Sequence, residues 1–444
     1  MDNTVQKIYD FSTEVDRQGF SSEVTNEIKK RIADSIFTSY GAKDSVPINI
    51  MRKALLPSGS KRNSTVYFTR QTASPEIATF INGSMTRYLD YNDTYLSKEA
   101  LHPSDNVPPV MALSESFDID GKRSINAIGV AYQVVCSLAD AVSIRDLGWD
   151  HVTYISISAA SGLAHLLDLD PVKFENAVSL GINNNISMRQ TRAGELSMWK
   201  GCTAANASRN SVFATLLAND GFTGPYPVFE GEMGFFKQVS GEFNLDLKAD
   251  RIKKTMIKNY PVEYHAMSAA EAASNIRNRM KGDIKKIEVE TFTVAHTIII
   301  KDPEKLRPKT KETADHSMPF IIAYTLAYGD PVPDSYSDKY LKDGRILDLI
   351  DKSTFRVTEK FDSMYPEFLP VKIKVTTDAG EYEEEIDIPK GHHKSPYSWD
   401  DLRKKGARVA GDDFAKNVVD LVSSFEKRSA RELLEVISDV DTER

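Results

Sequence analysis

Three short segments of the sequence combine imidazole, carboxylate and cationic side chains with Gly, Pro and Asn, a mixture typical of sites that transfer protons. The first covers residues 82–94 and continues at residues 102–106. In a helix, Asp90 and Thr94 lie one turn apart on one face. His102 precedes an apolar helix, whose N-terminus favours anions. The alternative is an ordinary buried hydrogen-bonded pair of Asp90 and His102.

The second segment, residues 189–201, places Arg189, Arg192 and Lys200 around a loop that contains Gly194. Guanidinium groups bind carboxylates in a bidentate manner, so this arrangement suits a polycarboxylate better than a neutral ligand. A lysine beside Trp199 would be partly desolvated, which lowers its pKa and makes it useful in proton transfer. The alternative is a solvated basic loop.

The third segment, residues 260–265, ends in His265, after which the periodicity of apolar residues changes. Ligand sites often form between domains, so this histidine is a candidate, although a structural role is the alternative. The sequence predicts no metal site, because no two histidines at helical spacing have a carboxylate partner. Weaker candidates are His151, residues 315–317 and residues 391–393.

The composition excludes several classes of protein. The chain has 444 residues, of which 41% are hydrophobic and 27% charged, which is enough apolar material for a sizeable core. Its net charge of −8 argues against binding to nucleic acid. Two cysteines, Cys136 and Cys202, exclude a disulfide framework, a four-cysteine zinc site and an iron–sulfur cluster held by three cysteines of this chain.

No targeting or membrane segment is recognisable in the sequence. The first residues contain neither the basic nor the apolar region of a secretory signal. No window approaches the ~20 consecutive apolar residues that a membrane-spanning helix needs. We therefore expect a cytoplasmic protein that has no membrane partner.

The periodicity of apolar residues changes after residue 265. Before it, helical spacing predicts helices at residues 24–37, 125–142, 171–186 and 204–219. After it, residues 286–292 and 371–375 alternate as strands do. Residues 378–380 form a turn signal, and residues 382–388 alternate again, which predicts a hairpin. Residues 315–328 and the segment after residue 398 return to helical spacing.

This pattern predicts a fold that is mainly α with an α+β part. A large all-helical domain comprises residues 1–265 and, discontinuously, residues 396–444, while residues 266–395 form the smaller α+β domain. The terminal segment is assigned to the helical domain because an amphipathic stretch must bury its apolar face against another element.

Six segments in their order along the chain resemble the MmgE/PrpD family. The resemblance implies a helical domain with an α+β lid domain, a homodimer, and a cofactor-free lyase whose site lies between the domains. The segments are residues 82–94, 102–106, 198–201, 260–265, 311–317 and 389–392.

The resemblance also implies what the protein does. Residues 92–93, 96–99 and 104–106 are more similar to the dehydratase branch of the family than to its decarboxylase branch. The implied function is a hydro-lyase that dehydrates 2-methylcitrate, with citrate as a second candidate substrate, to 2-methyl-cis-aconitate in propionate catabolism. The alternatives are a cis-aconitate decarboxylase and a non-catalytic carboxylate-binding protein.

The residues that match the family's site suggest a mechanism. His102 or His265 would be the base that removes a carbon-bound proton, and the other would be the acid. We expect Asp90 to orient His102 by accepting its second ring proton, and Lys200 to hold a substrate carboxylate. The remaining substrate-binding candidates are Thr94, His151, Arg189 and Arg192.

Overall fold

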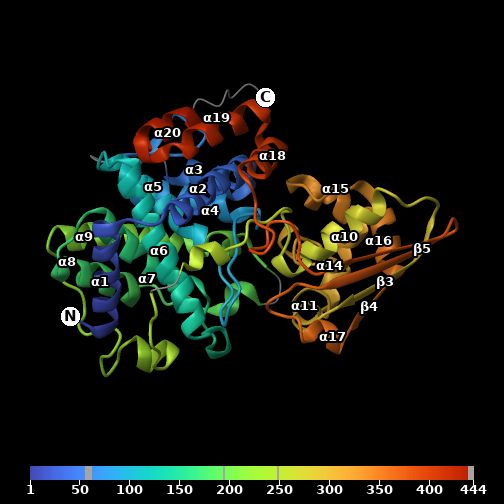
Figure 1. Cartoon of the computed structure of the whole chain (residues 1–444), viewed down its shortest axis with the longest axis horizontal. Coiled ribbons are helices and arrows are strands. Elements are labelled where there is room, and N and C mark those ends of the chain that lie inside the picture. Colours follow the sequence, from blue (N-terminus) through green and yellow to red (C-terminus); the bar gives the residue numbers. More distant parts are fainter. Residues whose placement is uncertain (56–62, 194–195, 248–249, 439–444) are drawn as a thin grey trace.

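The computed structural model describes the chain except for residues 56–62, 194–195, 248–249 and 439–444. It has a large helical part and a smaller part that contains a sheet (Figure 1). Within the described residues, no helix combines the length and the apolar character needed to cross a membrane. The architecture confirms the predicted class, mainly α with an α+β part.

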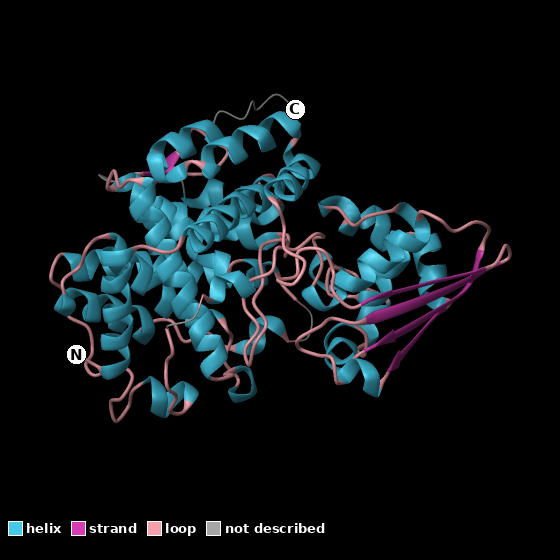
Figure 2. Cartoon of the chain, in the orientation of Figure 1, coloured by secondary structure: helices cyan, strands magenta, loops and turns pink. Residues whose placement is uncertain are grey.

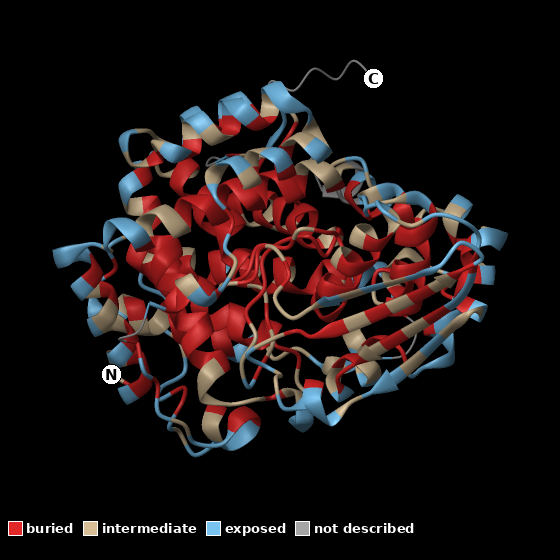
Figure 3. Cartoon of the chain, turned by 45° about the vertical axis from the view of Figure 1, so that its right-hand side comes forward, coloured by how far each residue is buried: buried red, intermediate tan, exposed pale blue. Residues whose placement is uncertain are grey.

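Helices that are apolar on every side form the centre of the large part (Figure 3). All residues of α7 (Val152–Leu166) are buried, and α7 packs along α6 (Gly121–Ala141). A helix without a polar face belongs in a core, where neighbouring helices cover it. The surrounding elements are α1 (Asn3–Gln18), α2 (Ser22–Ala42), α3 (Val46–Leu55), β1 (Ser64–Thr65), β2 (Thr72–Ala73), α4 (Pro75–Tyr88), α5 (Val107–Ser116), α8 (Pro171–Asn183) and α9 (Thr203–Asn219).

The smaller part contains a four-stranded sheet in the order β4-β3-β5-β6 (Figure 2). The predicted hairpin is confirmed: β5 (Val371–Thr377) pairs antiparallel with β6 (Glu381–Ile386). The other strands are β3 (Ile284–Thr291) and β4 (Ser353–Val357), which pair in parallel. The helices of this part are α10 (Met267–Arg277), α11 (Thr293–Ile299), α12 (Pro303–Leu306), α13 (Lys311–Ala314), α14 (Met318–Tyr328), α15 (Asp338–Leu341), α16 (Gly344–Asp351) and α17 (Glu359–Asp362).

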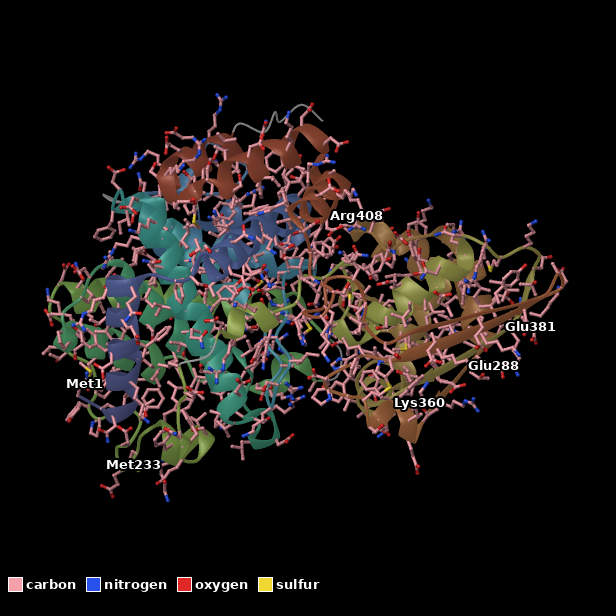
Figure 4. The ribbon with its side chains drawn as sticks, viewed as in Figure 1. Met1, Met233, Glu288, Lys360, Glu381 and Arg408 are labelled. Carbon is pink, nitrogen blue, oxygen red and sulfur yellow. The ribbon has the colours of Figure 1, made fainter. Side chains whose placement is uncertain are left out.

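One face of this sheet is covered and the other is charged. Helix α10 packs against β5 and β6, and the buried residues of β5 alternate with partly exposed ones. On the open face, Lys372 pairs with Glu383 at 2.7 Å and Lys374 with Glu381 at 2.9 Å. Figure 4 shows Glu288 and Glu381 at this outer sheet, away from the helical part. The alternation therefore follows from one covered and one solvated face.

The last three helices return to the helical part, where they lie beside the N-terminal helices (Figure 1). They are α18 (Trp399–Ala410), α19 (Asp412–Ser423) and α20 (Ala430–Ser438). Leu402, Val418 and Leu433 belong to the same buried cluster as Ile32. A second cluster comprises buried residues from Met256 to Val375. The second cluster begins before residue 265, and the division at residues 265 and 395 stays a proposal.

Some predicted helix boundaries were wrong. The helix expected from residue 125 begins at Gly121. Asp120 is its N-cap, because the Asp120 side chain accepts a hydrogen bond from the Arg123 backbone N–H at 2.8 Å. A Cβ at Gly121 would lie 1.9 Å from the carbonyl oxygen of Phe425, so this residue must be glycine. The helix expected from residue 315 is divided, because the Ser317 hydroxyl caps α14 by accepting a hydrogen bond from the Phe320 N–H.

A buried ion pair connects α18 to α2. The Lys405 ammonium group donates to Asp34 Oδ1 at 2.5 Å and to the carbonyl oxygen of Tyr91 at 2.8 Å. Neither side chain of the pair is exposed. Burial raises the pKa of Asp34, and burial lowers the pKa of Lys405 to about 8 although Asp34 opposes this. Each charge therefore depends on the other for compensation.

We expect Lys405→Met to lower the free energy of unfolding by about 3–5 kcal/mol, because it leaves the Asp34 carboxylate buried without its partner. Urea denaturation followed by circular dichroism measures the change. The double variant Asp34→Asn/Lys405→Met should recover part of the loss. Lys404→Met, which removes an exposed lysine paired with Asp400, is the control and should leave the midpoint unchanged. Coincident curves for Lys405→Met and Lys404→Met would contradict the role of the buried pair.

Candidate active site

Two loops meet to form the centre of the candidate site. The backbones of Thr94 and Met256 form an antiparallel bridge with N···O distances of 2.9 and 2.8 Å. The expectation that Asp90 and Thr94 share one face of a helix is wrong, since α4 ends at Tyr88 and Asp90 has a left-handed φ of 48°. The turn brings both the backbone carbonyl and the carboxylate of Asp90 to Lys258 Nζ, each at 2.8 Å.

The Asp90 carboxylate is buried among cations from three segments. It accepts hydrogen bonds from Lys258 at 2.8 Å and from both Arg87 and Lys200 at 3.2 Å. Burial alone would raise the pKa of Asp90, but Lys258, Lys200 and Arg87 hold it well below its usual value. Asp90 is therefore ionised, and its charge gathers the three cations at one point.

His102 is oriented by the backbone rather than by Asp90. Its Nδ1–H donates to the carbonyl oxygen of Asp93 at 2.7 Å, while its Nε2 lies 3.9 Å from Asp90 Oδ1. The expectation that Asp90 accepts the second ring proton was wrong, because Asp90 turns toward Lys258. Burial lowers the pKa of His102 well below its usual value, and Arg87 adds to this effect. The ring is therefore a neutral imidazole whose Nε2 lone pair is free to accept a proton.

His265 lies in the 3₁₀ turn η7 (Tyr264–Ala266) of the opposite wall. Its Nδ1 donates to Glu263 Oε1 at 2.8 Å, and its Nε2 lies 3.4 Å from the Tyr365 hydroxyl. Burial alone would raise the pKa of Glu263, but the neighbouring His265 brings it down to about 2. The carboxylate of Glu263 thus fixes the orientation of the His265 ring.

Lys200 lies behind the site rather than in its wall. It belongs to η4 (Met198–Gly201), and its ammonium group lies 3.2 Å from Asp90 Oδ2 and 3.6 Å from Asp315 Oδ1. Burial lowers the pKa of Lys200, although both carboxylates oppose this. The pKa of Lys200 is lowered, as expected from the sequence. Trp199 does not explain the burial of the lysine, since Trp199 is itself 47% exposed.

Of the predicted substrate-binding residues, Arg192 and His151 contact a buried carboxylate, whereas Arg189 has no such contact among the described residues. The Arg192 guanidinium lies 2.7 Å from Asp150 Oδ2, and His151 Nδ1 lies 3.1 Å from Asp150 Oδ1. Asp150 therefore positions both side chains from behind. Arg189 is in η3 (Arg189–Arg192), and its guanidinium group has no ion-pair partner among the described residues. Arg189 is thus the cation most available to a ligand.

A cavity of about 140 Å³ brings most of these groups together where the helical part meets the smaller part. Five cationic side chains and three carboxylates line it, so an anion is the favoured ligand. Lys200 is not among the lining residues. The expected residues in the wall are Asp90, Thr94, His102, His151, Arg189, Arg192 and His265; the others are Arg87, Leu96, Glu99, Ala100, Arg145, Lys258, Glu263, Tyr264, Ile298, His316 and Tyr365.

The sequence did not single out Lys258 and Arg145, and His316 was only a weaker candidate. Lys258 lies between Ile257 and Asn259, shortly after Lys253 and Lys254, so no local pattern distinguishes it. No motif contains Arg145. Its position in the wall depends on Glu99, whose carboxylate accepts a hydrogen bond from the Arg145 backbone N–H at 3.1 Å.

Asp90, Asp315 and His316 offer ligand atoms within 4.8 Å of one another, which is close enough to consider a metal ion. Their charges are already compensated. Lys200 contacts both carboxylates, Lys258 binds Asp90, and Lys311 binds Asp315 Oδ2 at 2.9 Å. A divalent cation would meet these ammonium groups at contact distance, so the donor set fits a metal poorly.

Comparison with models of protein families shows to which family the chain belongs. The model of the MmgE/PrpD N-terminal domain matches residues 6–248, and that of the MmgE/PrpD C-terminal domain matches residues 260–424. The chain belongs to the MmgE/PrpD family. Residues 249–259 lie between the two matched regions and include Lys258 and the bridge residue Met256, while both matched regions contribute residues to the cavity wall. The candidate site of this family member is therefore built from both matched regions.

Several curated proteins are similar over most of the chain. The 2-methylcitrate dehydratase of Escherichia coli K12 is 28% identical over 400 residues, which cover 84% of this chain and 80% of that protein. The 2-methylcitrate dehydratase of Salmonella typhimurium LT2 is 26% identical over 430 residues, 88% and 83% of the two chains. The mitochondrial 2-methylcitrate dehydratase of Yarrowia lipolytica is 25% identical over 395 residues, 82% and 73% of the two chains.

We expect His102 to remain neutral, with its proton on Nδ1, at pH values at which a solvated histidine is already charged. Histidine-selective ¹⁵N NMR, with His102→Gln to assign the signal, measures this. The pKa of His102 in the folded protein lies below the unfolded value of about 6.5. Its contribution to stability is therefore intact above pH 6.5 and falls as the pH decreases below it. A His102 ring that becomes protonated above pH 6.5 would contradict this electrostatic picture.

Proposed function

We propose that this protein is a hydro-lyase that dehydrates 2-methylcitrate, with citrate as a second candidate substrate, to the corresponding cis-aconitate. Two findings support the proposal. Similar proteins that cover most of the chain are named 2-methylcitrate dehydratase. The cavity combines five cationic side chains with four imidazoles, which suits a small tricarboxylate that must lose a proton and a hydroxyl group.

The reaction imposes two requirements on the site. Removing a proton from the carbon next to a carboxylate places negative charge on that carboxylate, which nearby cations must stabilise. Expelling the tertiary hydroxyl requires a proton donor. Arg87, Arg189 and Lys258 supply positive charge in the wall. The base and the acid come from the histidines, so the proposed reaction uses no cofactor.

The observation that carries this proposal is the state of His102. A carbon base must be neutral and must direct a lone pair at the substrate. The bond from Nδ1–H to the Asp93 carbonyl leaves Nε2 as the acceptor, and burial with Arg87 lowers the pKa of the ring. The Thr94 hydroxyl, 3.2 Å from His102 Nδ1, remains our candidate for a hydrogen bond to the substrate.

The remaining roles follow from position. The hypothesis from sequence leaves open which of His102 and His265 is the base; with His102 as the base, His265 is its candidate for the acid. Lys200 acts on the substrate through Asp90, because its ammonium group lies on the far side of that carboxylate. Arg189 binds a substrate carboxylate, and Asp150 holds Arg192 and His151 beside it.

We also propose that the protein forms a homodimer in the cytoplasm and that α8, α9 and their neighbouring turns form the contact. Eight large apolar side chains of this region are 47–76% exposed. Helices α8 and α9 pack against each other, and η4 packs against α9. Exposed apolar residues in such numbers are typical of protein interfaces. They are Val172, Met188, Met198, Trp199, Phe213, Phe222, Tyr226 and Met233.

We expect His102→Gln to lower turnover of 2-methylcitrate by about 100- to 10,000-fold, which is the usual contribution of a general base. The ultraviolet absorbance of the new conjugated double bond measures the rate. Binding of tricarballylate, which lacks the hydroxyl group, should change little. His393→Gln, which alters a partly exposed histidine outside the cavity, is the control. Near-normal turnover by folded His102→Gln would remove His102 from the mechanism.

Product analysis separates the proposed reaction from its alternatives. Proton NMR of the protein with 2-methylcitrate should show a new alkene, and cis-aconitate should release no carbon dioxide. Carbon dioxide from cis-aconitate would instead identify a decarboxylase, which needs the same cationic pocket. Tight binding of all three acids without turnover would identify a carboxylate-binding protein. Each assay is repeated with a chelator, and activity lost to the chelator would contradict the cofactor-free mechanism.

A further inference from the structure

His316 is a third imidazole in the cavity wall, at the junction between α13 and α14. Its Nδ1 donates to Asp315 Oδ1 at 2.5 Å. So short a contact requires a proton between the two atoms, which leaves Nε2 for the cavity. The Asp315 carboxylate is itself fixed by Lys311, at 2.9 Å, and by Lys200, at 3.6 Å. The ring of His316 is therefore held in one orientation by a buried carboxylate.

His316 and His102 flank the same carboxylate from different parts of the molecule. The Nε2 of His316 lies 3.5 Å from Asp90 Oδ2, and the Nε2 of His102 lies 3.9 Å from Asp90 Oδ1. Both rings line the cavity. The two ring nitrogens therefore lie at different oxygens of one carboxylate, and a ligand in the cavity would meet both.

The two rings differ in how readily they take up a proton. Burial lowers the pKa of both rings; for His102, Arg87 and Lys258 lower it further, and Asp90 alone raises it. His316 faces Lys200, which lowers its pKa, but Asp315 and Asp90 raise it, and Glu263 lies close enough to interact. The carboxylates of a bound triacid add further negative charge beside the ring. Of the two rings, His316 is therefore the one that can carry a proton when the substrate is present.

His265, by comparison, is enclosed. Its side chain is 4% exposed, against 17% for His316. The ring packs against the stacked rings of Phe292 and Tyr365, with centroids 5.8 and 5.7 Å away, and the Tyr365 hydroxyl lies 3.4 Å from its Nε2. These contacts suit a structural role for His265 in the cavity wall better than a role in protonating the departing hydroxyl group.

We infer that His316, held by Asp315, is the general acid that protonates the departing hydroxyl group while His102 removes the carbon-bound proton. This inference rests on the proposed dehydration. The carbon–hydrogen bond breaks and its proton moves to His102 Nε2; its electron pair forms the double bond. The carbon–oxygen bond breaks, and the hydroxyl group takes the proton of His316 Nε2 and leaves as water. Solvent then returns a proton to His316 and removes one from His102.

The test uses a leaving group that needs no acid. Fluoride is a much weaker base than hydroxide, so the analogue of 2-methylcitrate with fluorine in place of the departing hydroxyl bypasses the acid but still needs the base. For the natural substrate, we expect His316→Gln to lower turnover by about 100- to 10,000-fold. Fluoride elimination by the same variant should fall far less, whereas His102→Gln should lose both reactions. Fluoride release is followed with an ion-selective electrode.

Matched variants and binding data complete the design. His265→Gln should show no preference for the fluorinated substrate, and His393→Gln should behave as the wild type. Circular dichroism and tricarballylate binding report whether each variant is folded with its site intact. Equal losses with both leaving groups in His316→Gln, or selective rescue by fluoride in His265→Gln, would overturn the role of His316. A wild-type protein that converts neither compound would overturn the proposed function, and this role with it.

Discussion

The buried charge of Asp90 is the constraint on which the candidate site depends. An ionised carboxylate can be removed from water only when cations and hydrogen-bond donors replace its hydration. Arg87, Lys200 and Lys258 supply these partners from α4, η4 and the segment that leads into the smaller part. Each cation in turn depends on Asp90. Fold and site are therefore coupled, since moving one of these segments would leave a charge uncompensated.

The same concentration of charge sets the chemistry of the cavity. The positive groups around Asp90 disfavour a positive charge on the His102 ring. The backbone carbonyl of Asp93 keeps the single ring proton on Nδ1. They also favour an anionic ligand, whose carboxylates would supply the negative charge that the pocket lacks. A site built to bind a polycarboxylate is thus also a site that keeps a nearby imidazole neutral. One electrostatic arrangement serves both binding and proton abstraction.

Both parts of the molecule contribute histidines to the cavity. His102 and His151 come from the helical part, His265 lies at the proposed boundary between the parts, and His316 comes from the smaller part. An elimination that uses a base from one side and an acid from the other requires the two parts to remain in register around the substrate. The bridge between Thr94 and Met256, together with the bonds of Lys258, fixes the segment that leads into the smaller part next to the reacting groups.

The sequence by itself determined the elements whose pattern is local. Helical periodicity and strand alternation specified several of the longer helices and the β5–β6 hairpin, because each depends on residues a few positions apart. His102 and His265 could be proposed from the sequence because unusual local composition surrounds them. Only the tertiary structure decided that Asp90 turns toward Lys258, 168 residues away, and that Lys200 lies behind the cavity. Electrostatic partners are chosen by distance in the folded chain, and periodicity carries no information about contacts between segments so far apart.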